Sequence, residues 1–442
     1  MSQAGGVDRL GGMRTQPTYV VGGGLAGLTA AAALATAGHA VTVLESTSEL
    51  GGRARSRRRD GFSMNVGPHA VYKGGVGYPI LRRLGVPLHG GAPNFRRYGV
   101  ITGGTARRAA RYVATLRRPI STVRAMLGAG SRSARELAGT SVADWLSDAV
   151  PDARSRAVVE SLVRTTNYAA DLDLLDAGAA ARQMRNALRG VLYVHGGWQT
   201  MVDGLADIVI AHGGTIRRNA PVSRVHQDGQ RATGITLDDG TEIDADRIVV
   251  AVNEARRAVA LIDGPPLLDL EVAAAAAVPI RMAHLDVALR PLPQRRIVTA
   301  LGLDERVFVS TPSDVADVAP ADGAVVSVGR YLAPDEEADD HRGELEAALE
   351  AVQPGWTDHV VDVRYVPRSM VAGDHPRVAT NGTLGRPTVG IAGVTGLAVA
   401  GDWIGPRGAL ADASVRSGWD AAALVAPRSL SHTPAAPSLT AP

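Results

Sequence analysis

The most regular pattern of apolar and polar positions lies near the start of the chain, in residues 18–55. Residues 18–21 are β-prone, residues 25–37 are rich in alanine, and residues 40–44 form a second apolar run. Gly38 stands where the C-cap glycine of a helix belongs. The pattern therefore predicts a strand, a glycine-rich turn, a helix and a second strand.

The turn of this unit carries the spacing G-x-G-x-x-G at Gly22, Gly24 and Gly27. The first glycine permits a tight turn, the second lets the backbone approach a pyrophosphate, and the third lets the helix pack closely on the strand. The helix start offers free amides and the positive end of its dipole to phosphate. Glu45, at the tip of the second strand, can accept hydrogen bonds from ribose hydroxyls. The unit therefore predicts a dinucleotide site rather than an ordinary glycine-rich turn.

A second glycine pair with an arginine, Gly51-Gly52-Arg53, follows shortly after Glu45. Its amides and guanidinium can bind the same phosphates. This extension resembles the superfamily of FAD-dependent amine oxidases, phytoene desaturases and protoporphyrinogen oxidases, in which the first nucleotide motif continues into a G-G-R segment. The resemblance implies FAD as the cofactor. It also implies an α/β fold, with a glutathione-reductase-like (Rossmann-type) FAD-binding domain and a discontinuous substrate domain of mixed helices and sheet.

Two later segments extend the resemblance. Residues 65–75 are similar to the segment that crosses one side of the flavin ring, which would place Tyr72 and Lys73 toward the substrate cavity. Residues 396–415 resemble the second FAD motif, in which Asp402 would hold the ribityl chain. In the family the backbone of the residue that matches Val222 pairs with the adenine edge.

The first motif and the resemblance together give the residues expected to bind the cofactor. They are Gly22, Gly24, Leu25, Ala26, Gly27, Glu45, Gly52, Arg53, Gly67, Pro68, His69, Val222, Gly401, Asp402, Leu410 and Ala411. The catalytic candidates are His69 and Lys73, and no spacing of residues predicts a metal site.

The domain organisation follows from the same motifs and from the composition between them. The FAD-binding domain is expected at residues 15–95, 195–265 and 386–425, the substrate domain at 96–194 and 266–385, and disordered tails at 1–14 and 426–442. In the first half of the substrate domain, residues 105–116 and 120–137 have helical spacing and an arginine-rich face. Such helices can lie on a membrane surface, but a solvated face on an arginine-rich protein is the favoured interpretation.

Composition excludes several classes of protein. The chain has no cysteine, which excludes disulfides, iron–sulfur clusters and thiol redox chemistry. The net charge is +3, Lys73 is the only lysine, and the low aromatic content of 4% argues against nucleic-acid binding. No apolar run is long enough for a transmembrane helix, and residues 1–16 lack the core of a secretory signal. We expect a cytoplasmic protein, with peripheral membrane contact left open.

Three departures from the family patterns bear on the substrate. No lysine follows Lys73, so the late lysine common in amine oxidases is absent. Leu410 occupies one position of the aromatic cage that holds amines. Residues 403–407 differ from the motif of bacterial phytoene-type desaturases. These departures favour desaturation of a lipophilic or natural-product small molecule. Amine or amino-acid oxidation, and a redox-neutral isomerase, cyclase or binding module, remain as alternatives.

Overall fold

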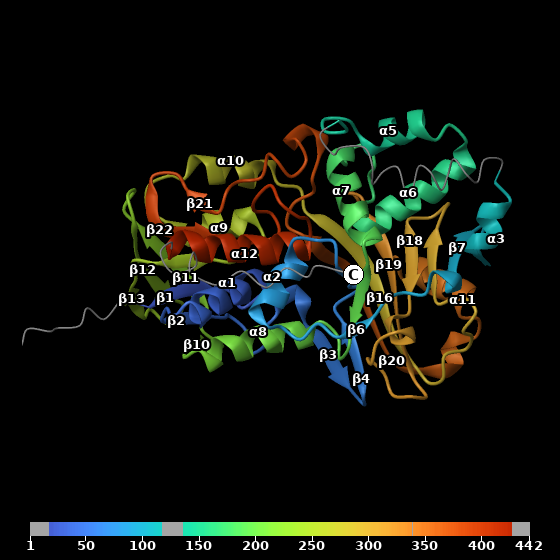
Figure 1. Ribbon diagram of the computed structural model, residues 1–442, viewed down its shortest axis with the longest axis horizontal. Helices are drawn as coiled ribbons and strands as arrows, with labels where there is room; N and C mark the ends of the chain where they lie inside the picture. Colours follow the sequence, from blue (N-terminus) through green and yellow to red (C-terminus); the bar gives the residue numbers. More distant parts are fainter. Residues whose placement is uncertain (1–16, 117–135, 338, 427–442) are drawn as a thin grey trace, which may run out of the picture.

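The structure is a computed structural model that describes residues 17–116, 136–337 and 339–426. Its elements form two lobes that lie side by side (Figure 1). One lobe holds a mainly parallel sheet with helices, and the other holds a larger, mainly antiparallel sheet with its own helices. This mixed arrangement confirms the predicted α/β fold class, whereas the domain boundaries given above stay a prediction.

A six-stranded sheet forms the centre of the first lobe, and it contains both strands predicted from residues 18–44. In spatial order its strands are β10 (Thr215–Arg217), β2 (Val41–Leu44), β1 (Thr18–Val21), β14 (Ile248–Val250), β22 (Val394–Val399) and β21 (Gly390–Ile391). The first five run parallel, and β21 is antiparallel to β22. The carboxyl ends of β1 and β14 therefore lie at one edge of the sheet, next to each other, where ligands of such folds bind.

Helices cover one face of this sheet and a second, smaller sheet covers the other. The helices are α1 (Leu25–Thr36), α2 (Gly77–Leu84), α8 (Gln199–Ala211) and α12 (Ala411–Val425). The opposite face packs against β11 (Val222–Gln227), β12 (Ala232–Leu237), β13 (Glu242–Asp244) and β15 (Ile262–Asp263), with α9 (Ala255–Leu261) and α10 (Leu268–Ala276). The alanines of α1 are buried because α8 and α12 pack closely on it, and a Cβ on Gly418 of α12 would lie 2.2 Å from the Ala26 carbonyl oxygen.

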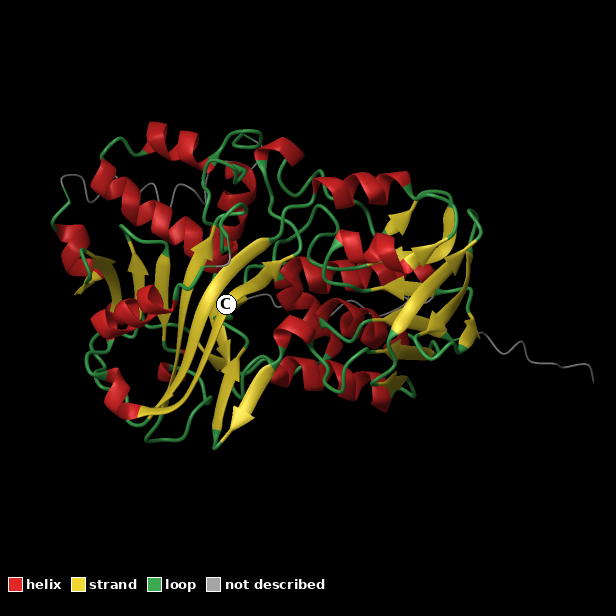
Figure 2. Cartoon of the chain, turned by 180° about the vertical axis from the view of Figure 1, so that it is seen from behind, coloured by secondary structure: helices red, strands yellow, loops and turns green. Residues whose placement is uncertain are grey.

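A seven-stranded sheet forms the second lobe (Figure 2). Its strands in spatial order are β20 (Val360–Ala372), β16 (Ile280–Leu289), β19 (Ala324–Leu332), β18 (Val307–Ser310), β17 (Thr299–Gly302), β7 (Tyr98–Thr102) and β8 (Thr105–Arg108). The helix α11 (Arg342–Val352) packs on one face through Leu345 and Leu349, against Leu285 and Val287 of β16. Because strand residues alternate between faces, Met282, His284 and Asp286 of β16 lie on the other face.

A helical block and several short elements complete the second lobe and its connections. The block comprises α3 (Ala109–Ala114), α5 (Val142–Ala149), α6 (Ala153–Asn167) and α7 (Ala177–Leu188). The remaining strands are β3 (Ser56–Arg59), β4 (Phe62–Asn65), β5 (Val71–Tyr72), β6 (Gly90–Gly91) and β9 (Val191–Val194). Single 3₁₀ turns are η1 (Gly52–Ala54), η2 (Phe95–Arg97), η3 (Pro312–Asp314), η4 (Trp356–His359) and η5 (Val378–Thr380).

The helical predictions between residues 96 and 194 are met in part. The helix predicted at 105–116 is wrong in its first turn, because residues 105–108 pair with β7 across a turn in which Gly103 and Gly104 both have positive φ. Nearly all of the helix predicted at 120–137 lies outside the described residues, as do both predicted tails apart from residue 426. The favoured solvated face of these helices, with membrane contact left open, therefore stays a prediction. Within the described residues, no helix combines the length and apolarity needed to cross a bilayer.

Candidate active site

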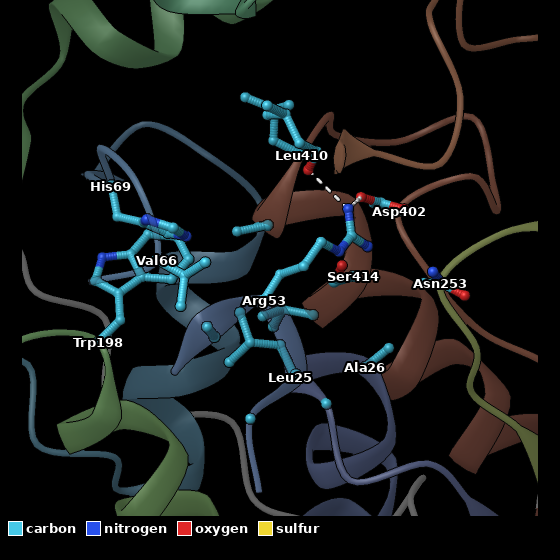
Figure 3. Close-up of a pocket in the computed structure, with 18 of the residues that line it drawn as sticks. Leu25, Ala26, Arg53, Val66, His69, Trp198, Asn253, Asp402, Leu410 and Ser414 are labelled. Carbon is cyan, nitrogen blue, oxygen red and sulfur yellow. Dashed lines mark hydrogen bonds and ion pairs between the residues drawn. The ribbon is translucent and has the colours of Figure 1, made fainter. Parts of the chain in front are cut away.

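A cavity of about 490 Å³ lies where the carboxyl ends of β1 and β14 meet the second lobe. It brings together most of the residues that the sequence predicts for the cofactor. Those that line it are Gly22, Gly24, Leu25, Ala26, Glu45, Gly52, Arg53, Gly67, Pro68, His69, Gly401, Asp402, Leu410 and Ala411. In Figure 3, His69 and Trp198 lie toward one end of the cavity, and Asn253 and Asp402 lie toward the other.

The three glycines of the first turn have three different surroundings. A Cβ on Gly22, whose φ is +107°, would lie 2.3 Å from the Ala251 carbonyl oxygen. A Cβ on Gly27 would lie 1.9 Å from the Gly22 carbonyl oxygen, so Gly27 serves the packing of α1 and does not itself line the cavity. A Cβ on Gly24 would meet no atom within 4 Å. The space beside Gly24, at the amino end of α1, therefore fits a phosphate that approaches the backbone.

Glu45 is held in place by a set of hydrogen bonds at the end of β2. Its Oε2 accepts a hydrogen bond from the Gly23 amide at 2.7 Å, and its Oε1 accepts from the amide and the hydroxyl of Thr47, each at 2.9 Å. The carboxylate lines the cavity and is about 9% exposed. Because a carboxylate oxygen can accept two hydrogen bonds, Oε2 can still accept one from a ribose hydroxyl.

Arg53 and Asp402 join the two cofactor motifs from opposite ends of the chain. The Nη1 of Arg53 lies 2.7 Å from Oδ2 of Asp402 and donates to the Val371 carbonyl, also at 2.7 Å (Figure 3). The other oxygen of Asp402 accepts from the Gly373 amide at 3.1 Å. The structure thus places the Arg53 guanidinium on Asp402, and its predicted contact with phosphate stays a prediction.

His69 lies in the wall of the cavity with one ring nitrogen fixed. Its Nδ1 is 2.9 Å from the Gly67 carbonyl oxygen, and since a carbonyl can only accept, Nδ1 is the nitrogen that carries the proton. The ring stands edge-on to Trp198, with centroids 4.5 Å apart. Burial lowers the pKa of His69, and the Gly67 carbonyl offsets part of this effect. His69 is therefore a neutral imidazole at pH 7, with Nε2 able to accept a proton.

Sequence reasoning missed three titratable groups beside this segment. His284 lines the cavity and Asp286 lies behind it, both fully buried on β16. Asp412, in the first turn of α12, also lines the cavity, and its Oδ1 accepts from the Gly77 amide at 2.9 Å. Burial raises the pKa of Asp412 to about 7. A histidine and an aspartate inside the mainly apolar run of residues 280–289 were the signal in the sequence for the first two.

Besides Gly27, two predicted residues lie outside the cavity. Val222 begins β11 in the core between the two sheets of the first lobe, and its backbone contact with adenine stays a prediction. Lys73 does not line the cavity but is exposed, with its amide bonded to the Gly190 carbonyl at 2.8 Å and its side chain lying over Gly190. The expectation that Lys73 faces the substrate cavity is therefore corrected, because the pairing of β5 with β9 directs this position to solvent.

We expect Lys73→Met to retain the wild-type FAD content and the wild-type rate of flavin reduction. The ammonium lies in solvent, so its removal changes neither a buried contact nor the wall of the cavity. Released flavin can be measured by absorbance, and reduction by stopped-flow spectroscopy with any substrate that bleaches the flavin. A fall in the reduction rate at unchanged FAD content would return Lys73 to the site.

The Rossmann-type sheet, the glycine turn at the amino end of α1 and the acid after β2 define a dinucleotide-binding protein. Residues 25–280, more than half of the chain, match the family model described as flavin containing amine oxidoreductase. The chain belongs to this family, and its cofactor is FAD. Among the described residues, no group of three His, Asp or Glu side chains is arranged to hold a metal ion.

Individual relatives resemble the chain over short stretches. It is 42% identical over 71 residues to the L-amino acid oxidase Cdc18 of Crotalus durissus cumanensis, a match that covers 16% of this chain and 14% of the relative. It is 48% identical over 52 residues to a 4,4'-diapophytoene desaturase of Staphylococcus haemolyticus, over 12% of this chain and 10% of the relative. The matches thus span a small part of each relative's length.

The fold is shared over almost the whole chain. An oxidoreductase from Methanosarcina mazei superimposes with a TM-score of 0.72 and 20% identity, over 92% of this chain and 99% of the other. At this level of identity the likeness concerns the fold alone.

Proposed function

We propose that the protein uses FAD to remove a hydride from a C–H bond of a lipophilic or natural-product small molecule, leaving a carbon–carbon double bond. The observation that carries the proposal is the charge distribution in the cavity wall. Among the described residues around Gly67, Pro68 and His69, the only charged groups of this wall are the histidines and Asp412, and one Asp412 oxygen is already bonded to the Gly77 amide. A neutral, apolar substrate suits such a wall, because burying an unpaired charge there is unfavourable.

Each charged side chain of the cavity either has a hydrogen-bond or ion-pair partner within the protein or lies away from His69. Among the described lining residues they are Glu45, Arg53, Arg257, Asp402 and Asp412, besides His69 and His284. Glu45 is bonded to its own turn, and Arg53 and Asp402 are bonded to each other. Arg257 belongs to α9, which follows the carboxyl end of β14 at the dinucleotide end of the cavity.

The remaining wall near His69 is apolar or aromatic. Tyr168 donates its hydroxyl to the Pro68 carbonyl at 3.1 Å and so presents its ring rather than a free polar group. Met282, Met370 and Leu410 contribute flexible or branched apolar surface. Methionine side chains adapt their shape to irregular apolar ligands, which supports a lipophilic substrate.

The reaction needs two acceptors. When FAD is bound, it accepts the hydride, that is, one hydrogen with both electrons of its C–H bond. The adjacent carbon loses a proton, and the electron pair of that second C–H bond forms the new double bond. We propose that His69 accepts this proton on Nε2, since its Nδ1 already carries one and its lowered pKa keeps the ring neutral.

Oxidation of an amine or amino acid is the second candidate, and Asp412 is the observation that favours it. A substrate ammonium placed beside this carboxyl would draw its pKa below the value of about 7 that burial gives it. The local match to an L-amino acid oxidase is consistent with this alternative. The bond between Asp412 and the Gly77 amide weakens it, because that oxygen already has a partner.

We expect the purified, FAD-loaded protein to be bleached without oxygen by members of an isoprenoid and polycyclic lipophile panel, and not by amines or amino acids. The oxidised flavin absorbs in the visible range and loses this band on reduction, so the readout needs no knowledge of the product. His69→Gln should retain FAD and slow the bleaching. Bleaching by an amine would overturn the proposal in favour of the second candidate. Turnover of a lipophile without bleaching would indicate redox-neutral chemistry instead.

A further inference from the structure

The Gly67 backbone connects His69 to a buried pair on β16. The Gly67 carbonyl accepts from Nδ1 of His69 at 2.9 Å, and the Gly67 amide donates to Oδ2 of Asp286 at 3.1 Å. Asp286 receives a second hydrogen bond on Oδ1 from the Ser327 hydroxyl, at 2.7 Å. A continuous path of hydrogen bonds therefore runs from the cavity wall to the centre of the seven-stranded sheet.

His284 completes this arrangement. Its Nδ1 lies 2.9 Å from Oδ2 of Asp286, which is ion-pair distance, although the ring nitrogen is not aligned for a hydrogen bond. Its Nε2 has no hydrogen-bond partner among the described residues. Gly67 has a φ of +82°, and a Cβ there would lie 3.3 Å from Cδ2 of His284, so the ring packs directly on the Gly67 backbone. A histidine and a carboxylate, both fully buried, thus face the segment that carries His69.

We propose that Asp286 and His284 are positioning residues for His69, which hold the Gly67 turn and set the charge against which His69 takes up and releases a proton. The inference rests on the role proposed above for His69 and deepens it. A proton acceptor in a buried wall needs a nearby negative charge when it becomes a cation, and the ring must keep one orientation. Asp286 supplies the charge, and its bond to the Gly67 amide fixes the orientation.

Besides burial, which lowers the pKa of His69 most, and the Gly67 carbonyl, the groups that act on this pKa have opposite signs. From β16, Asp286 raises the pKa of His69 and His284 lowers it, with the effect of Asp286 the larger of the two. From η1, the Arg53 backbone carbonyl raises it slightly, and the uncharged Trp198 ring covers the edge of the imidazole. The two members of the pair should therefore move the titration of His69 in opposite directions when each is removed.

The test is a pH titration of the visible spectrum of the oxidised, FAD-loaded, full-length protein without substrate. A spectral step that disappears in His69→Gln reports the ionisation of His69. In His284→Gln the effect of His284, which lowers the pKa of His69, is removed while that of Asp286 remains, so the midpoint of this step should rise by about one pH unit. In Asp286→Asn the midpoint should fall, because the carboxylate that favours the protonated His69 ring is gone.

His341→Gln is the matched control. This histidine is also buried and lies 3.6 Å and 3.7 Å from two carboxylates, Glu336 and Glu344, but does not line the cavity. Its removal should leave the midpoint unchanged. The proposal is overturned if both β16 variants shift the midpoint in the same direction, if neither shifts it more than the control, or if no step depends on His69. If Asp286→Asn does not fold, the direction found for His284→Gln decides alone.

This experiment separates the inference from the proposed function. The titration uses no substrate. If neither substrate panel bleaches the flavin, the desaturation proposal is contradicted, but the titration result is unaffected. If the two β16 variants shift the midpoint in opposite directions and only an amine bleaches the flavin, the positioning role of Asp286 and His284 stands. The reaction is then amine oxidation rather than desaturation.

Discussion

Replacing Gly24 with alanine is expected to leave the protein folded but nearly empty of FAD, whereas the same change at Gly27 is expected to unfold the first lobe. A Cβ at Gly24 meets no atom within 4 Å, and the residue has an ordinary extended backbone with φ −80°. The added methyl therefore disturbs only a ligand that approaches the amino end of α1. Because the pyrophosphate approaches the backbone at this glycine, we expect the methyl group to weaken FAD binding about 100-fold. This corresponds to a loss of about 2.8 kcal/mol of binding free energy, at about 1.4 kcal/mol for each factor of ten.

At Gly27 the added Cβ would lie 1.9 Å from a backbone oxygen, that of Gly22, which no side-chain rotation can relieve. The helix α1 would have to move away from β1, although it is buried between α8 and α12. A shift of this kind in a close-packed core lowers the free energy of unfolding by about 3 kcal/mol or more.

Circular dichroism of the FAD-free proteins during heating separates the two outcomes, and fluorescence titration with FAD measures the affinity. Gly38→Ala is the matched control in the same helix region, because its Cβ also meets open space and only its φ of +83° causes strain. That control should lose about 1 kcal/mol of stability and keep its FAD. An equally stable Gly24→Ala variant with wild-type affinity would contradict the assignment of the phosphate to this turn.

The parts of the site that the sequence predicts are those formed by neighbouring residues. The turn at Gly22–Gly27 and the acid at Glu45 belong to one strand–helix–strand unit, so their spacing alone defines their geometry. The helix predicted at residues 105–116 was wrong only in its first turn, where the chain forms a strand instead. Its apolar periodicity suits a helix, but pairing with β7 in the seven-stranded sheet determines the conformation of its first four residues.

Contacts between distant segments could not be predicted in this way. Gly67 and Asp286 are 219 residues apart, and Arg53 and Asp402 are 349 residues apart. Nothing in the local sequence of β16 indicates which segment its polar face meets. For Lys73 the local sequence was misleading. Its position beside a flavin motif suggested that it faces the cavity, but the direction of its side chain depends on the pairing of β5 with β9.

Glu45→Ala is expected to produce the second large effect, on both stability and cofactor binding. The carboxylate accepts hydrogen bonds from the Gly23 and Thr47 amides and the Thr47 and Ser46 hydroxyls. Removing it leaves the Gly23 amide without its acceptor next to the buried start of α1. A buried donor that loses its partner lowers the free energy of unfolding by about 1–3 kcal/mol. Loss of the charged acceptor for the ribose should weaken FAD binding by about 100-fold.

The two effects can be measured separately, by urea unfolding of the FAD-free protein and by titration with FAD. Glu49→Ala is the control, because Glu49 is an exposed acid in the same loop and its ion pair with the exposed Arg55 contributes little. A stability loss at Glu45 with unchanged affinity would restrict this residue to the turn and contradict contact with the ribose. Reduced affinity in a fully stable variant would instead locate its whole effect on the ligand. The bond to the Gly23 amide predicts that both losses occur together, since the carboxylate that holds the turn also lines the cavity.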